Sequence, residues 1–449
     1  MGNAPITPLR GHAVSSRVLT PPPAQNLDDA VRLCDPYSPL DAREDSSLFA
    51  NLTAIRGSDR LGRIVRNIRR SGGILTLHFV SGHLGSGKTT ELLRMKVQLE
   101  TAAHGAPLAT VLFLDADVML NRTDIDLEDI LLALWKLVDE QRKAAAAKVL
   151  LPLWKDQIKE ALSKTNTNLS GDISEALTRV LGEVRLSSAE RRKDIRTALR
   201  STTAVLIEGL NKAFAATREA PDEGAGPLVV LIDNMEKLSQ AHHEGVERLY
   251  RERMGALKSL DAHLVITVPL YLCYAPAGAG LSGLYGGEIV VVPMIEVRRR
   301  AAEGGGDNQG GVTALAGLLR KRVRFDPLFE EGDRAAERIA CLSGGCIRHA
   351  LHMVRAASNE HDDPPVTAAS VDRAAAILQA DFERALPERY VPILRHIAET
   401  NRFPDQCEEG VKRDLLLNLF VLEYQNGGPD PWHAVHPLVE RCRKYREHG

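Results

Sequence analysis

The residues best suited to chemistry lie between Ile74 and Thr90, where an apolar stretch runs into Gly82-His-Leu-Gly-Ser-Gly-Lys-Thr89. Glycines at this spacing let successive backbone N–H groups turn inward toward phosphate oxygens. The Lys88 ammonium would reach β- and γ-phosphates, and the Thr89 hydroxyl would complete the shell of a magnesium ion. A plain glycine-rich turn would explain neither residue. The pattern predicts a phosphate-binding loop whose ligand contacts come from Gly82, His83, Leu84, Gly85, Ser86, Gly87, Lys88, Thr89 and Thr90. We expect Lys88 to face solvent in the nucleotide-free protein.

A second acidic position follows the apolar run Leu228-Val-Val-Leu-Ile. Such a run predicts a fully buried parallel strand, and Asp233 falls at its carboxyl end, where ligands gather in open α/β sheets. A carboxylate buried there needs a partner or a metal ion. We therefore predict that Asp233 and Thr89 hold Mg²⁺ and that the bound nucleotide is ATP.

The general base is less well defined. In most P-loop ATPases of the additional-strand group a glutamate directly follows the strand-end aspartate, whereas this chain has Asn234 there and its nearest acid is Glu236. Glu236 is the base if the turn swings it inward; otherwise it forms a salt bridge on the following helix. Geometry decides between these alternatives. We expect ATP hydrolysis to be slow or to need a partner.

Composition limits the class of protein. The chain has 449 residues, 44% of them hydrophobic, a net charge of −2 and six cysteines without a Cys-x-x-Cys pair. The length and hydrophobic fraction predict several domains with hydrophobic cores, and the scattered cysteines predict reduced thiols. The nearly neutral net charge predicts no overall electrostatic attraction to nucleic acid. No apolar run is long enough to span a bilayer, and the first thirty residues lack a signal core, so we expect a cytoplasmic protein without membrane contact.

The spacing of hydrophobic residues along the chain predicts the helices and strands that position these residues. Apolar runs predict five parallel strands near residues 74–80, 109–115, 228–232, 262–267 and 288–292, a doubly wound α/β sheet of the P-loop NTPase type. We predict a disordered segment over 1–32 and an ATPase core over 33–297, with two short helices between 45 and 70 and a helical insertion at about 126–217. A lid is predicted over 298–366 and a separate domain over 367–449. Thr267 ends the fourth strand, where its hydroxyl either senses the γ-phosphate or satisfies a backbone group.

Two sets of arginines have alternative interpretations. Arg63, Arg66, Arg69 and Arg70 favour a solvated helix face over a nucleic-acid patch. The arginines within 191–200 likewise favour ordinary helix solubility over a partner or phosphate surface.

A third signature, Ser343-Gly-Gly-Cys-Ile-Arg348, resembles the lid turn of AAA+ ATPases, particularly the origin-recognition branch. In that branch the arginine of this turn reaches the γ-phosphate, so the resemblance implies that Arg348 is the sensor-two residue. The resemblance to this family covers roughly residues 45–360. Lys88, Asp233, Glu236, Thr267 and Arg348 form the predicted catalytic set.

The chain also departs from that family. The segment Leu281–Glu288 contains no arginine that could act on a neighbouring subunit, although Arg251, Arg253 or Arg298-Arg-Arg300 could substitute. Signal-transducing (STAND) NTPases are the nearest rival, but they usually have Gly-x-Pro at the lid. The sequence leaves open whether the chain forms a homo-oligomer.

The hydrophobic pattern of the carboxyl-terminal region predicts helices followed by a hairpin. This order fits the winged helix that follows the lid in origin-recognition-like ATPases. Its arginines and Lys444 could touch phosphates, whereas Trp432, His436 and Leu438 favour core or a protein surface. We expect an AAA+-like ATPase that acts as a switch on DNA or a companion effector, with bacterial anti-phage defence as one setting. The alternative is a STAND-like signalling scaffold with little hydrolysis.

Overall fold

A computed structural model describes residues 22–41, 43–101, 108–141, 152–163, 165, 167, 173–218, 226–238, 243–275, 278, 280, 281, 283, 289–425 and 430–447. Its centre is one parallel sheet in the order β2-β3-β4-β1-β5. The five strands expected from the sequence are confirmed as β1 (Leu77–Ser81), β2 (Thr110–Asp115), β3 (Leu228–Asp233), β4 (His263–Thr267) and β5 (Ile289–Val291). Strand β4 lies between β1 and β3, which is the additional-strand arrangement.

The register of the sheet brings acids together at its carboxyl edge. Strands β2 and β3 pair in parallel so that Asp115 is level with Asp233. Strand β1 ends beside β4 and β5, and the glycine-rich loop leaves from that end. The phosphate-binding loop and both acids therefore share one edge.

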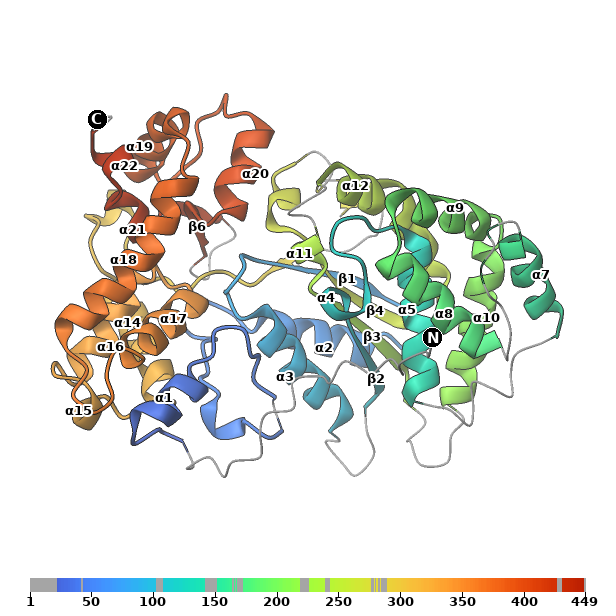
Figure 1. The fold of residues 1–449 in the computed structure, drawn as a ribbon, viewed down its shortest axis with the longest axis horizontal. Helices are drawn as coiled ribbons and strands as arrows, with labels where there is room; N and C mark the ends of the chain where they lie inside the picture. Colours follow the sequence, from blue (N-terminus) through green and yellow to red (C-terminus); the bar gives the residue numbers. More distant parts are fainter. Residues whose placement is uncertain are drawn as a thin grey trace, which may run out of the picture.

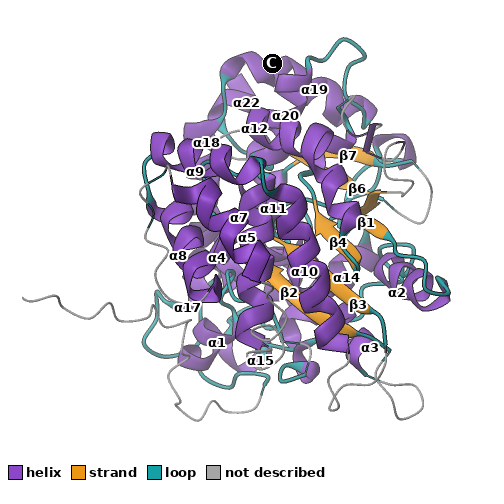
Figure 2. Cartoon of the chain, turned by 90° about the vertical axis from the view of Figure 1, so that its right-hand side faces the viewer, coloured by secondary structure: helices purple, strands orange, loops and turns teal. Residues whose placement is uncertain are grey.

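Helices cover both faces of the sheet (Figures 1 and 2). On one face α2 (Arg60–Arg70) and α3 (Lys88–Glu100) pack on alternate side chains such as Val80, Val229 and Val265. On the other face α5 (Leu127–Gln141) and α10 (Thr203–Arg218) bury the opposite set, including Phe79 and Ile232. Burial on both faces explains why the strands are continuous apolar runs.

The helical insertion is confirmed and contains α5, α7 (Pro152–Ser163), α8 (Ile173–Leu186), α9 (Ala189–Arg200) and α10. Two of its arginines, Arg192 and Arg196, are buried. Arg196 Nη2 lies 2.5 Å from Asp129 Oδ2, and Arg192 and Arg200 pair with Asp124 and Asp126. The preference for a solvated face was therefore wrong for Arg192 and Arg196, whereas Arg200 is exposed as that preference expects.

The lid contains α14 (Gln309–Arg320), α15 (Phe325–Leu328), α16 (Asp333–Leu342) and α17 (Ile347–Ser358). The amino-terminal segment joins it, because Ala24 pairs with Val323 and α1 (Leu27–Leu33) packs on α17. The expected disorder is therefore wrong for residues 22–32, and residues 1–21 lie outside the described range. Residues 45–58 hold only the 3₁₀ turn η1 (Ser46–Leu48) instead of a helix, so one of the two expected short helices is absent there.

The carboxyl-terminal region begins with α18 (Ala368–Ala385), which contacts α16 and α17 of the lid as well as α21 (Pro437–Glu440). We call the elements after it the carboxyl-terminal unit: η6 (Glu388–Tyr390), α19 (Val391–Thr400), α20 (Glu409–Leu417), β6 (Val421–Tyr424), β7 (Trp432–Val435), α21 and α22 (Arg443–Glu447). Strands β6 and β7 form the expected antiparallel hairpin, giving a winged-helix-like unit. Trp432, His436 and Leu438 are buried in it, as expected for core.

Short elements complete the core: α4 (Ala116–Met119), α11 (Met235–Leu238), α12 (His243–Arg248), the π-helix η2 (Leu249–Arg253), η3 (Met254–Ser259), η4 (Leu270–Cys273) and η5 (Ala301–Glu303). In the described ranges, every helix is too short or too polar to traverse a bilayer.

Candidate functional site

The predicted phosphate-binding loop has the cradle shape that its glycines permit. Gly82, Gly85 and Gly87 have φ of 146°, 80° and 92°, and α3 begins at Lys88. Gly85 cannot be replaced without displacement, because a Cβ there would lie 2.7 Å from Arg348 Cβ and from Cys346 Sγ. Ser86 is buried, whereas Leu84, Thr89 and Thr90 are half-buried. The loop is thus wedged between the sheet and the lid.

Lys88 is 4% exposed, so the expectation of a solvent-facing side chain was wrong. Its Nζ donates to the carbonyls of Gly82 and His83 at 2.8 and 2.9 Å and lies 2.9 Å from Glu236 Oε1. The loop curls around the ammonium, which explains the burial. A phosphate would exchange with Glu236 as the partner of Lys88.

Asp233 is fully buried at the end of β3, at the predicted position. In the described part of the chain, neither carboxylate oxygen makes a hydrogen bond of normal geometry. Burial and the neighbouring Glu236 charge raise its pKa, while Thr89, the Asn234 amide and Lys88 act to lower it. A bare buried carboxylate beside a threonine hydroxyl is a site that a cation would stabilise.

The turn after β3 swings Glu236 inward. Asn234 takes the left-handed conformation with φ of 64° and donates from Nδ2 to Asp115 Oδ1 at 2.8 Å. This turn directs Asn234 away from the loop and places Glu236, on α11, against Lys88. Burial works to raise the Glu236 pKa, but Lys88 outweighs it and the pKa is lowered. The geometry supports the inward alternative, with the salt bridge made to the loop itself.

Thr267 is fully buried, and its Oγ1 accepts a hydrogen bond from the Met235 amide at 3.0 Å. It also acts to lower the pKa of Glu236. Tyr250 donates to its carbonyl at 2.7 Å. Thr267 therefore satisfies a backbone group, as one alternative expects, and γ-phosphate sensing stays a prediction.

Arg348 is the second residue of α17, and its Cβ lies close to Gly85 of the phosphate-binding loop. Gly345 allows the tight turn before it with φ of 82°, since a Cβ there would lie 1.8 Å from the Ile295 carbonyl oxygen. The guanidinium carbon of Arg348 is 5.6 Å from the centre of the Tyr37 ring. The arginine therefore stacks on an exposed tyrosine next to the loop.

Two buried residues at the loop differ from the sequence-based expectation, because Arg56 was not predicted there and His83 was predicted as a ligand contact. Arg56 donates from Nη2 to the Ser86 carbonyl at 2.5 Å and pairs through Nη1 with Glu91 at 3.2 Å. The His83 side chain points away from the cradle and binds the carboxyl-terminal unit. Arg56 lies outside the loop motif, and the motif does not specify the residue type at His83, so only the fold reveals what these two side chains contact.

Most arginines proposed as substitutes for a subunit-bridging arginine have internal partners. Arg253 pairs with Glu128, Arg298 pairs with Glu440 at 2.7 Å, and Arg300 lies over the Trp432 ring. Arg251 and Arg299 are exposed.

The residues present fit a magnesium ion. No cluster of three or more His, Cys, Asp or Glu that could hold a metal occurs among the described residues. A P-loop ion needs fewer protein ligands, because substrate phosphates supply the others. Thr89 and the bare Asp233 carboxylate would hold it.

Comparisons with known proteins place these features in context. No protein-family model and no curated protein matches the sequence. The Walker-type ATPase PABY2304 of Pyrococcus abyssi has 14% identity and a TM-score of 0.46, covering 92% of this chain and 99% of its own. The ORC1 protein of Aeropyrum pernix in complex with DNA has 14% identity and a TM-score of 0.40, covering 93% and 96%. Drosophila ORC bound to DNA has 13% identity and a TM-score of 0.38, covering 99% and 96%.

Proposed function

We propose that this chain is a magnesium-dependent, AAA+-like ATPase that acts as a conformational switch. The observation that carries the proposal is the convergence of Lys88, Glu236 and the buried Asp233 carboxylate at one point beside the phosphate-binding loop. These residues come from two strand ends that pair with β4. A structural role alone would not require three charged groups in so small a volume.

The residues have separable roles. The loop amides and Lys88 bind the β- and γ-phosphates, while Thr89 and Asp233 hold Mg²⁺, which neutralises charge on the transferred phosphoryl group. When a phosphate takes over Lys88, Glu236 loses its salt bridge and becomes able to accept a proton from water. Thr267 positions the turn that carries Glu236.

A trapping experiment tests this assignment. Glu236→Gln should bind Mg²⁺–ATP but lower its hydrolysis at least about a hundredfold, within the range of general-base catalysis. Asp233→Asn should lose the magnesium dependence of binding. Asp117→Asn is the matched control, because Asp117 pairs with Lys237 and Arg122 instead of the loop. Unchanged turnover in Glu236→Gln would remove Glu236 from the mechanism.

A second candidate is a nucleotide-dependent scaffold that barely hydrolyses ATP. Two observations favour it: Asn234 stands directly after Asp233, and Glu236 is held by Lys88. Turnover of the purified protein, with and without DNA, distinguishes the two candidates.

We infer that the partner is more readily a companion protein than DNA. In a helix-turn-helix domain the second helix enters the major groove. The helix before the hairpin here, α20, packs on η4 of the ATPase core, and acids precede and begin it. The ORC1 and ORC structures are complexes with DNA, so duplex DNA belongs in the binding assay. Self-association and a setting in anti-phage defence stay predictions.

A further inference from the structure

The side chain of His83 joins the phosphate-binding loop to the carboxyl-terminal unit. Its Nδ1 lies 3.2 Å from the Leu416 carbonyl oxygen on α20, and its Nε2 accepts from the Glu423 amide on β6 at 2.8 Å. The residue is 2% exposed. His83 occupies a position whose residue type the loop motif does not specify. Its side chain nevertheless forms a hydrogen bond with a residue more than three hundred positions later in the sequence.

These two bonds require one form of the ring. The Leu416 carbonyl only accepts, and the Glu423 amide only donates, so His83 must be neutral with its proton on Nδ1. Burial, followed by the charge of Lys88, lowers the His83 pKa to about 3. The neutral form that fits the bonds is therefore the form present at neutral pH.

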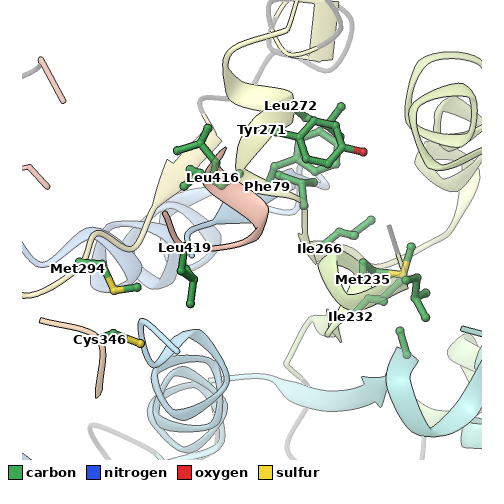
Figure 3. Close-up of a cluster of buried hydrophobic side chains, with 14 of the residues drawn as sticks. Phe79, Ile232, Met235, Ile266, Tyr271, Leu272, Met294, Cys346, Leu416 and Leu419 are labelled. Carbon is green, nitrogen blue, oxygen red and sulfur yellow. The ribbon is translucent and has the colours of Figure 1, made fainter. Parts of the chain in front are cut away.

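Apolar packing and hydrogen bonds hold the segment that His83 contacts against the ATPase core. Leu416 and Leu419 enter the same buried cluster as Phe79 of β1 and Tyr271 of η4 (Figure 3). The Glu423 carboxylate accepts from the Tyr274 hydroxyl, and its carbonyl accepts from the Met294 amide at 3.2 Å. The β6 backbone is thus held on the core on both sides of His83.

The main chain of His83 is part of the cradle. Its carbonyl accepts from Lys88 Nζ, and the Ser86 amide donates to the same carbonyl at 3.2 Å. Fixing the ring therefore fixes the carbonyl that helps to aim Lys88.

We propose that His83 is a positioning residue through which the docked carboxyl-terminal unit keeps the phosphate-binding loop ready for nucleotide. This inference rests on the proposed function. Because binding free energies are linked reciprocally, a loop that binds ATP more tightly when the unit is docked also holds the unit more tightly when ATP is bound. The nucleotide state would thus reach the carboxyl-terminal unit directly, in addition to any path through the lid.

The test measures docking and binding separately. Amide hydrogen exchange over residues 415–424 reports docking, because this segment contains the Glu423 amide that donates to His83. Calorimetry with Mg²⁺–ATP reports affinity. The variants are His83→Ala, His83→Gln, which keeps an acceptor near Nε2, and His83→Asn, which keeps a donor near Nδ1. His78→Gln is the control, since His78 lies near the start of β1, the strand that leads into the loop.

In His83→Ala we expect exchange over 415–424 to accelerate and ATP affinity to fall, each by about tenfold, as the loss of two ordinary hydrogen bonds implies. The Gln and Asn variants should each recover part of both effects, and they carry the test if the alanine variant does not fold. A role confined to loop shape would weaken binding without changing exchange in the nucleotide-free protein. Wild-type exchange or affinity in His83→Ala would overturn the inference alone, whereas absence of Mg²⁺–ATP binding by the wild type would overturn the proposed function and the inference with it.

Discussion

The Lys88–Glu236 pair determines how the site holds charge before a nucleotide binds. Both side chains are buried and lie 2.9 Å apart. The motif predicts Lys88 as a phosphate ligand, but it could not show that a glutamate three residues beyond Asp233 would serve as its resting partner. That partner depends on the turn after β3, which the residue types alone leave open.

This burial gives a stability prediction. Lys88→Ala should lower the free energy of unfolding by about 3 kcal/mol, because removing one partner of a buried pair leaves the other without compensation. Urea unfolding near pH 7.5 measures the change. The double variant Lys88→Met, Glu236→Gln should regain much of the loss. Wild-type stability in Lys88→Ala would mean that the pair is solvated.

At the scale of elements, the turn between β3 and α11 decides where the candidate base lies. Asn234 has a positive φ, which asparagine tolerates better than most residues and which β-branched residues strongly disfavour. The strands were predictable because burial on both faces demands continuous apolar runs. The direction of Glu236 was not, because a single asparagine permits several turns.

The turn can be tested directly. Asn234→Val should reduce ATP turnover far more than ATP binding, because strain of about 1–3 kcal/mol would displace Glu236 while leaving the loop intact. Asn234→Gly is the matched control and should keep most turnover, since glycine adopts positive φ freely. Steady-state kinetics alongside calorimetry separates the two effects. Equal turnover in both variants would contradict a role for this turn.

The lid turn at Gly345 supports a second prediction at this scale. Arg348→Ala should retain ATP binding through the loop but lose the difference between ATP and ADP in protease protection after residue 367. A charge-assisted contact to the γ-phosphate is worth about 1.5–3 kcal/mol, enough to shift the lid population. Arg355→Ala, on the same helix and paired with Asp35, is the control. A persisting difference in Arg348→Ala would make Arg348 structural.

Elements that depend on distant partners were the hardest to predict. Residues 22–32 contain little local pattern, yet Ala24 pairs with Val323 and α1 packs on the lid. The insertion arginines looked like surface charge because their acidic partners lie more than sixty residues earlier in the chain. Local sequence cannot show such pairings, whereas the sheet and the hairpin follow from local periodicity.

For the whole molecule, the lid, the ATPase core and the carboxyl-terminal unit meet around the phosphate-binding loop (Figure 1). Tyr424 donates to the Gly344 carbonyl at 2.7 Å, and His349 lies 3.0 Å from His436. Arg298 pairs with Glu440. These contacts join the lid to the carboxyl-terminal unit. The phosphate-binding loop contacts both parts, because the Gly85 carbonyl accepts from the Ile347 amide of the lid at 3.1 Å and His83 bonds to the carboxyl-terminal unit.

This arrangement makes stability depend on pH. Burial lowers the pKa of His83 and His349 to about 3 and of His433 to about 4, and it lowers the pKa of His78, His263, His352 and His436. A histidine with a lowered pKa contributes stability above about pH 6.5, the unfolded value, which is lost as the pH falls below it. Burial raises the pKa of fewer carboxyls, Asp129, Asp233, Glu296 and Glu423, and these act in the opposite direction.

The histidines outnumber those carboxyls, so acidification from pH 7 to 5 should lower the free energy of unfolding. Each excess proton taken up by the unfolded chain contributes about 1.4 kcal/mol per pH unit. Urea unfolding across this range measures the slope. His83→Gln should show a shallower slope than the wild type. A stability that rises on acidification would contradict the buried neutral histidines.

The most direct test of the central claim is a calorimetric titration of Mg²⁺–ATP into the wild-type protein and into Lys88→Arg, which keeps the charge but not the compact ammonium. We expect saturable binding at one site per chain in the wild type, dependence on magnesium, and loss of most of the affinity in the variant. Absence of binding by the wild type, or equal binding by the two proteins, would contradict it.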